Sequence, residues 1–255
     1  MNMVLSSGGS GFAKGYNCGP RSLYWCRAIT QREWIAKMSV PARVERYIAD
    51  LPLLHSWDRG KTWNTGGFMP EELKAIYDFA RENRPVDAQI LETGAGNSTI
   101  VFLLLSPARV VSIAPKAELF ERIRSYCARS GIAMGALTAT VDRSEWALPK
   151  MAMDITAGTA PRFDFILIDG NHNWPMVFVD FFYTNFMLKT GGFLMIDDTQ
   201  LHSVKELARM LLEQPEFRLE KKMRKSMIFR RIADAPTLRN WEAIPSIVRL
   251  SGEPL

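Results

Sequence analysis

The chain has 255 residues, of which 47% are hydrophobic and 23% are charged. This composition excludes a disordered or fibrous protein and is typical of a globular protein with one main hydrophobic core. The 32 Lys and Arg residues outnumber the 27 Asp and Glu residues, which gives a net charge of +5 and a pI near 9.2. A charge of this size affects solubility and non-specific attraction, and it does not define a function.

The cysteines and the apolar segments indicate the compartment. Cys18, Cys26 and Cys127 have neither CxxC spacing nor the density of a secreted disulfide scaffold, so reduced thiols are expected. No window approaches the roughly 18 apolar residues of a membrane span, and the first residues lack the apolar core of a signal peptide. We therefore expect a cytoplasmic protein without a membrane partner.

One group of basic residues lies in an expected hairpin near the end of the chain. Its members are Lys221, Lys222, Arg224, Lys225, Arg230 and Arg231. Such a group is more often a solvated face than a nucleic-acid surface. We expect no nucleic-acid partner.

The N-terminal part divides into a tail and a helical segment. Residues 1–29, which begin with many Gly, Ser and Asn residues, are predicted to be flexible. Residues 30–69 are predicted to form a helical or lid segment, with helices over 30–37 and 41–50. A loop with His55, Trp57 and Trp63 follows; it is either a lid or a set of surface anchors, and the pattern favours anchors.

Residues 70–235 are predicted to form the main domain, and 236–255 a C-terminal extension. The expected elements are a helix at 70–82, strand 88–92, helix 98–105, strand 109–113, helix 116–130, strand 136–141, strand 161–170, helix 175–188, strand 191–198, helix 203–213 and a hairpin of strands 217–222 and 226–232. Continuous apolar strands separated by helices indicate a parallel sheet covered on both faces. The predicted fold is α/β: a Rossmann-like, doubly wound, mostly parallel seven-stranded sheet with an antiparallel C-terminal hairpin.

The first expected strand of this sheet runs into the turn Glu92-Thr93-Gly94-Ala95-Gly96-Asn97-Ser98. Gly94 and Gly96 permit positive φ angles and close approach of a ligand, and Ser98 can cap the next helix. Taken alone, this spacing also fits a tight strand-to-helix turn without a ligand. Glu92 disfavours a pyrophosphate but can receive an ammonium group or ribose hydroxyls.

Carboxylates follow two other apolar strands at the same expected edge of the sheet. Asp169 ends one strand, and Asp197 and Asp198 end another. A single Asp there would most often cap a helix, but three together repel one another unless a cation or a proton lies between them. Hard oxygen ligands of this kind suit Mg²⁺ or another divalent cation.

His172 lies three residues after Asp169, in the turn that leaves the same strand. Its ordinary pKa suits a general base that takes a proton from a hydroxyl. A structural histidine with satisfied hydrogen bonds is nearly as good an interpretation. His55 and His202 have less context and are assigned no role.

Four segments in order, ILETGAGNST, VVSIAPKAELFERI, FDFILIDGNHNW and KTGGFLMIDDTQ, resemble the motifs of class I S-adenosylmethionine-dependent methyltransferases. The third and fourth look most like the branch of small-molecule O-methyltransferases that acts on catechols, caffeoyl-coenzyme A and macrocin-type sugars. The resemblance covers residues 70–232. It implies methyl transfer from S-adenosylmethionine to an oxygen of a small-molecule acceptor, such as a sugar or another polar metabolite. The sequence allows a homodimer and leaves the oligomeric state open.

The resemblance also implies roles for individual residues. The expected cofactor-binding residues are Glu92, Gly94, Ala95, Gly96, Ser98, Ile113, Asp142 and Asp169. Asp142 would meet the adenine amine, with Trp146 as a stacking neighbour. Asp169, Asp197 and Asp198 match the positions that bind a divalent metal in metal-dependent members, and His172 with Asp169 would act in catalysis.

Two positions depart from the pattern of that family. The second strand of these enzymes usually ends in an acid that accepts both ribose hydroxyls, whereas this chain has Ala114, followed by Lys116. A carboxylate often lies two positions after the first metal-binding Asp in the sugar enzymes, and this chain has Asn171. These departures keep a second hypothesis open: a catalytically silent protein that acts as a binding or scaffold module. A nucleic-acid methyltransferase would need a basic surface or an Asn/Asp-Pro-Pro-Tyr motif, and neither is found.

Overall fold

The computed structural model describes residues 38–56, 58–234, 242 and 248. Its helices are α2 (Val40–Ala49), α3 (Pro70–Asn83), α4 (Asn97–Leu104), α5 (Ala117–Ser130), α6 (Ser144–Thr156), α7 (Met176–Met187) and α8 (His202–Glu213). Its strands are β1 (Gln89–Thr93), β2 (Arg109–Ala114), β3 (Leu137–Val141), β4 (Phe163–Ile168), β5 (Leu188–Ile196), β6 (Phe217–Lys222) and β7 (Met227–Arg231). The expected helix at 30–37 lies outside the described residues.

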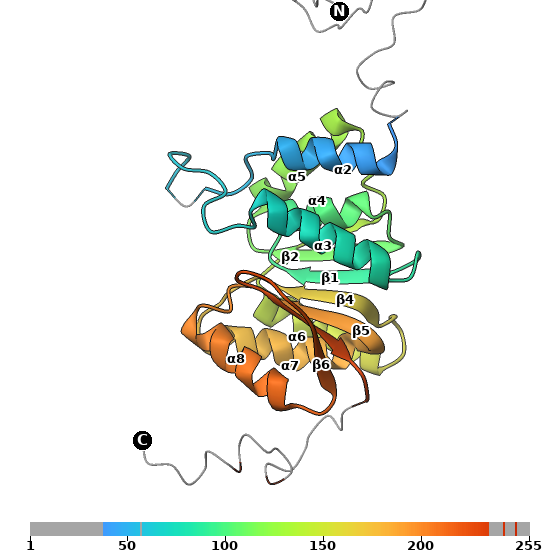
Figure 1. Ribbon diagram of the computed structural model, residues 1–255, viewed down its shortest axis with the longest axis vertical. Coiled ribbons are helices and arrows are strands. Elements are labelled where there is room, and N and C mark those ends of the chain that lie inside the picture. The colour runs from blue at the N-terminus through green and yellow to red at the C-terminus, as the bar shows by residue number, and fades with distance from the viewer. Residues whose placement is uncertain (1–37, 57, 235–241, 243–247, 249–255) are drawn as a thin grey trace, which may run out of the picture.

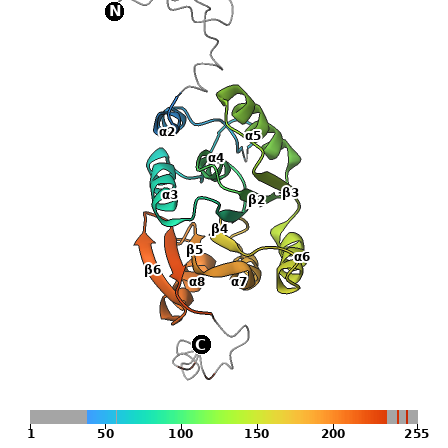
Figure 2. The same ribbon diagram turned by 90° about the vertical axis from the view of Figure 1, so that its right-hand side faces the viewer.

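The strands form one seven-stranded sheet in the order β3-β2-β1-β4-β5-β7-β6. Neighbours from β3 to β5 are parallel, and β7 pairs antiparallel with both β5 and β6. The predicted fold class is confirmed. Helices α2, α3, α4 and α5 lie on one face of the sheet and α6, α7 and α8 on the other (Figures 1 and 2).

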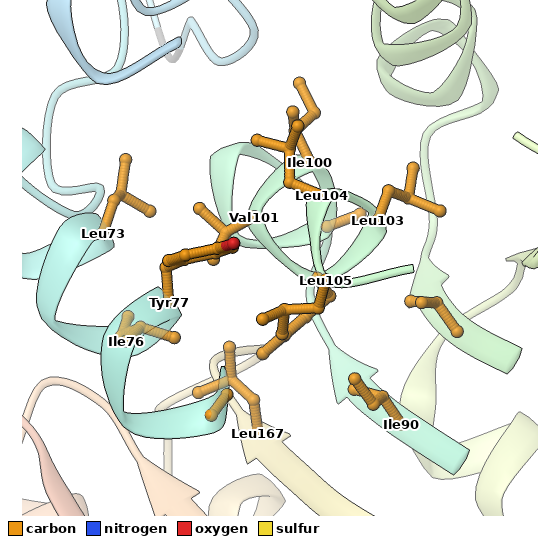
Figure 3. Packing of buried hydrophobic residues seen from close by; sticks show 14 of the residues in the cluster. Leu73, Ile76, Tyr77, Ile90, Ile100, Val101, Leu103, Leu104, Leu105 and Leu167 are labelled. Carbon is orange, nitrogen blue, oxygen red and sulfur yellow. The ribbon is translucent and has the colours of Figure 1, made fainter. Parts of the chain in front are cut away.

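Each face of the sheet has its own hydrophobic core, because successive strand side chains point to opposite faces. In β1, Ile90 packs in the core with α2 to α5, and Leu91 packs in the core with α6 to α8. Helix α4 is buried along its whole length, and after the polar first turn it is apolar on all sides. Figure 3 shows its side chains among those of α3 and of the strands.

Helix α2 belongs to the first of these cores. Ser39 caps the helix through a hydrogen bond from the Ala42 amide (3.4 Å), and Pro41 lies in its first turn. Tyr47 is 1% exposed, and its hydroxyl donates to the Asn97 carbonyl at 2.9 Å. The segment before the main domain is thereby fixed beside the start of α4; the predicted domain boundaries remain predictions.

The sequence pattern missed α6. This helix contains Pro149, which lacks an amide proton and normally ends a helix. Tertiary packing outweighs that cost, because Ala147, Leu148 and Ala152 are buried against the sheet. Among the described residues, none of the helices has the length and apolar character needed to cross a membrane.

Candidate active site

The order of the strands reverses between β1 and β4, where parallel sheets of this kind bind ligands at their carboxyl ends. The glycine turn, residues 94–98, leaves β1 at this point, and Asp169 follows β4. The Asp169 amide donates to the Thr93 carbonyl at 3.0 Å. The structure therefore brings the predicted turn and the first predicted acid side by side.

Position 94 requires a glycine, both because of its backbone conformation and because other atoms lie too close to it for a side chain. Its φ is +90°, and a Cβ added there would lie 2.4 Å from the Asp169 carbonyl oxygen. Its amide donates to the Ile113 carbonyl at 2.9 Å. Ile113 thus takes part through its backbone, while its side chain is buried in the core.

The Glu92 side chain supports the glycine turn from inside the protein. The carboxylate is fully buried and accepts hydrogen bonds from the hydroxyls of Ser98 (2.7 Å), Ser112 (2.5 Å) and Thr99. Burial raises the pKa of Glu92 to about 7, although the three hydroxyls act in the opposite direction. The carboxylate thus has three contacts within the protein, and its expected contact with a ligand stays a prediction.

This raised pKa predicts a change of stability with pH. Because the folded state binds the Glu92 proton more tightly than the unfolded state, the free energy of unfolding falls as pH rises from about 4.5 to about 7. The loss is about 3 kcal/mol, at 1.36 kcal/mol per pKa unit. Glu92→Gln is expected to remove most of it, measured by urea unfolding near pH 5 and near pH 8. The exposed Glu82→Gln is the control, and identical pH dependence in wild type and Glu92→Gln would contradict the prediction.

His55 covers the second glycine of the turn. A Cβ added at Gly96 would lie 2.5 Å from His55 Nε2, so a larger residue there would displace the imidazole. Burial lowers the pKa of His55, and the charges of Lys116 and Arg122 lower it further. A hydrogen bond with the Ala95 backbone acts in the opposite direction. The sequence pattern assigned no role to this histidine, because a single His in a loop without periodicity carries no signal.

The space left over the glycine turn is small. Its volume is about 30 Å³, which is room for one or two water molecules. It is lined by His55, Asn64, Gly67, Phe68, Ala95, Gly96, Asn97, Ser98 and Asp169. A hollow of about 750 Å³ lies elsewhere, between residues 50–54 and α5. It is lined by no residue of the glycine turn and by none of Asp169, Asp197 and Asp198, which together form the acidic edge of the sheet.

Asn64 and Arg122 hold the part of the loop that carries His55. Asn64 accepts hydrogen bonds from the amides of Leu54 (3.0 Å) and His55 (3.3 Å). Arg122 of α5 donates to the Leu54 carbonyl at 2.7 Å, and its guanidinium lies 5.0 Å from the centre of the Trp63 ring. A nucleoside-sized ligand therefore reaches the glycine turn only when this loop moves.

His172 and Asp198 form a hydrogen-bonded pair at the edge of the sheet. His172 Nδ1 lies 3.1 Å from Asp198 Oδ2, and Nε2 lies 3.7 Å from Asp169 Oδ1. Nε2 is buried and has no hydrogen-bond partner among the described residues. Burial would raise the pKa of Asp198, but hydrogen bonds from His172, Gln200 and Lys225 lower it. For Asp169 the shift is the opposite, because burial and the charge of Asp197 both raise the pKa. An imidazole held at Nδ1 by a carboxylate leaves Nε2 to accept a proton.

Asp197 does not join the expected group of metal ligands. It is 1% exposed, and its two oxygens accept hydrogen bonds from Lys225 Nζ (2.7 Å) and from the Ser226 hydroxyl. The positive charge that offsets the repulsion between Asp197 and Asp198 is thus the ammonium group of Lys225. The structure thus leaves Asp197 with partners inside the protein, and the expected set of three metal-binding aspartates stays a prediction.

A different group, Asp169, His172 and Asp198, has ligand atoms that all lie within 4.8 Å of one another. It fits the expected Mg²⁺ poorly, because Mg²⁺ prefers oxygen ligands and an imidazole suits transition metals better. In addition, Asp198 Oδ1 accepts from Lys225 and Gln200, and Oδ2 faces His172 Nδ1. The side chains at this edge therefore fit Mg²⁺ poorly, and the expectation of another divalent cation stays a prediction.

The residues expected around an adenosine group lie at the ends of β2 and β3. Ala114 is 4% exposed and packs in the core, so no carboxylate stands at the end of β2. Asp142 follows β3, accepts a hydrogen bond from the Arg143 amide (2.8 Å) and lies 3.8 Å from Lys150 Nζ. Trp146 is 62% exposed. Asp142 thus lies directly after β3, and Trp146 lies in the first turn of α6.

Comparison with known proteins agrees with this geometry. Residues 91–199 match a protein-family model described as a methyltransferase domain. No curated protein sequence matches the chain.

Solved structures of methyltransferases have the same fold. The O-methyltransferase TomG from Streptomyces achromogenes, in complex with S-adenosylmethionine, is 18% identical with a TM-score of 0.56; the alignment covers 77% of this chain and 100% of TomG. An O-methyltransferase from Bacillus cereus, in complex with S-adenosylhomocysteine, is 16% identical with a TM-score of 0.51, covering 77% of this chain and 92% of the other.

The resemblance found in the sequence is therefore confirmed. Residues 91–199 match a methyltransferase domain, and O-methyltransferases are among the proteins that share the fold of this chain.

Proposed function

We propose that this protein transfers a methyl group from S-adenosylmethionine to a hydroxyl oxygen of a small polar molecule, such as a sugar. The observation that carries the proposal is the His172–Asp198 pair. The Nε2 atom of His172 has no hydrogen-bond partner among the described residues and lies 3.7 Å from Oδ1 of Asp169, a residue that lines the space over the glycine turn. The methyltransferase-domain match and the O-methyltransferases of the same fold support the choice of reaction.

The turn between β1 and α4 is the proposed site for the methionine part of the cofactor. The backbone of Gly94, Ala95 and Gly96, the Ser98 side chain and Asp169 would surround it, and Glu92 would keep the turn in shape through its hydroxyl contacts. Asp142 would meet the adenosine part at the end of β3. When bound, S-adenosylmethionine would supply a methyl group on a sulfonium centre.

His172 is proposed to hold the proton of the acceptor hydroxyl. Asp198 fixes the imidazole through Nδ1, so that Nε2 can accept this proton as the oxygen becomes a nucleophile. The nearby Asp169, whose pKa is raised by burial and by Asp197, is proposed to help orient the acceptor. The protein groups would thus provide positioning and a base.

A catalytically silent binding module is the second candidate, and three observations favour it. His55 occupies the space above Gly96, and the cavity over the turn holds no more than about two water molecules. The absence of a ribose-binding acid at Ala114 acts in the same direction. Under this alternative, the loop with His55 would stay closed over the turn.

Calorimetric titration with S-adenosylmethionine and S-adenosylhomocysteine separates the two candidates. We expect both ligands to bind with a dissociation constant in the micromolar range, because the loop is held by only a few hydrogen bonds that ligand contacts can replace. Absence of heat and of thermal stabilisation at millimolar ligand would contradict the proposed enzyme and favour the silent module. A screen of hydroxyl-bearing acceptors for S-adenosylhomocysteine formation follows a positive titration.

A further inference from the structure

Lys225 places a buried positive charge inside the acidic edge. The residue lies in the turn between β6 and β7 and is 5% exposed. Its Nζ atom donates to Asp197 Oδ2 (2.7 Å), Asp198 Oδ1 (3.0 Å) and the Gly66 carbonyl (2.9 Å). Three acceptors use all three protons of an ammonium group, so Lys225 is fully coordinated by the protein.

The pairing of the strands explains why this ammonium reaches the acids. Strand β7 runs antiparallel to β5, with Ile196 opposite Met227. The next residues beyond this pair are Asp197 on one strand and Ser226 on the other, and Lys225 follows. The register thus sets a hydroxyl and an ammonium group directly against the carboxylates that end β5.

The ammonium group and its neighbours take up the oxygens that a metal ion would need. Ser226 donates to the second oxygen of Asp197, Gln200 donates to Asp198 Oδ1 at 3.0 Å, and His172 Nδ1 faces Asp198 Oδ2 at 3.1 Å. Each oxygen of the two aspartates therefore already has a donor. A divalent ion at Asp198 would also lie next to the fixed positive charge of Lys225, which repels it.

Packing fixes the ammonium group as well. Lys225 Nζ lies 5.0 Å from the centre of the Phe68 ring, which adds a cation–π contact on the side of the loop that covers the turn. Although burial opposes it, the hydrogen bond and charge of Asp197, with those of Asp198, raise the pKa of Lys225 above its usual value. The group is a permanent cation at neutral pH.

We propose that the Lys225 ammonium group is the resident cation of this carboxylate edge and keeps divalent metal ions out of it. It acts as a positioning residue: it holds Asp198, and Asp198 holds the His172 imidazole. The proposal has a second, catalytic half, which rests on the proposed methyl transfer. This half states that turnover needs no divalent metal ion.

Metal binding by the full chain tests the proposal without cofactor or acceptor. The probe is Mn²⁺ alone, followed by the electron paramagnetic resonance signal of the free ion, for wild type, Lys225→Met and the exposed Lys222→Met control. We expect no binding by wild type or by the control below millimolar Mn²⁺, and binding at least about tenfold tighter by Lys225→Met, whose aspartates have lost their ammonium partner. A micromolar site in wild type that Asp198→Asn removes would overturn the proposal, and so would a folded Lys225→Met that binds no better than wild type. If Lys225→Met does not fold, the comparison of wild type with Asp198→Asn still decides.

Turnover tests the catalytic half once an acceptor is known. The rate of wild type is expected to stay within twofold in the presence of chelator or added Mn²⁺. Lys225→Met is expected to lose at least about tenfold in kcat and to regain part of it with Mn²⁺, a rescue that a purely structural defect would not show. Loss of wild-type activity in chelator would overturn this half, whereas absence of cofactor binding would overturn the proposed function and leave the Mn²⁺ result valid.

Discussion

Methyl transfer is expected to slow by about 10²- to 10⁴-fold when His172 is replaced by alanine, with the affinity for S-adenosylmethionine unchanged within twofold. The reason is that His172 Nε2 is a buried nitrogen at the acidic edge without a hydrogen-bond partner in the part of the chain that the structure describes, and Asp198 holds the other ring nitrogen at 3.1 Å. Removal of the ring leaves the acceptor hydroxyl without its base, while the glycine turn is untouched. The measurement is the rate of S-adenosylhomocysteine formation with the acceptor found in the screen, together with calorimetric titration of the cofactor.

The matched control is His202→Ala, because His202 is exposed at the start of α8 and outside the pair. This variant is expected to keep the wild-type rate. Asp198→Asn is expected to show an intermediate loss, since the amide can no longer accept from Nδ1 in the same way and also loses its charge toward Lys225. A full rate in His172→Ala would assign the base to another group, with Asp169, whose Oδ1 lies 3.7 Å from His172 Nε2, as the next candidate.

The second large effect is expected from Gly94→Ala, which should abolish cofactor binding and lower the free energy of unfolding by about 3 kcal/mol or more. A residue with a Cβ at φ +90° is strained, and here the Cβ would lie 2.4 Å from the Asp169 carbonyl oxygen and 3.0 Å from its carbon. Neither backbone can yield easily. The Asp169 amide is bonded to the Thr93 carbonyl, and the Gly94 amide is bonded to the Ile113 carbonyl. The substitution therefore pushes apart the ends of β1, β2 and β4.

Urea unfolding and calorimetric titration of the same variant give the two readouts. Gly135→Ala is the control, since a Cβ at Gly135 meets nothing within 4 Å; its stability should stay within about 0.5 kcal/mol of wild type. Cofactor binding by Gly94→Ala with wild-type affinity would show that the pocket lies elsewhere. Loss of binding without loss of stability would show that the β1–β4 contact is softer than its distances indicate.

The framework of the sheet was readable in the sequence. Apolar runs such as those of β4 and β5 predict buried parallel strands, and the boundaries agree within a few residues because side-chain periodicity is a local property. The same pattern places Gly94, Asp169 and Asp198 at one edge, since all parallel strands end there. The helix α6 was the exception, because the local signal of Pro149 opposed packing contributed by residues far away in the chain.

Only the tertiary structure decided what the acids and the turn do. In the sequence alone, three aspartates indicate a metal site. In the folded chain, the pairing of β7 with β5 brings Lys225 and Ser226, which lie 28 and 29 residues further along the sequence, into contact with Asp197. The sequence pattern places Glu92 before the glycine turn, and the structure adds the hydroxyls of Ser98, Thr99 and Ser112 as its hydrogen-bond donors. His55 reaches Gly96 from a loop with no repeating pattern. The sequence determines which residues end each strand, whereas the partner of a buried charge depends on strand register and loop packing, which no local pattern encodes.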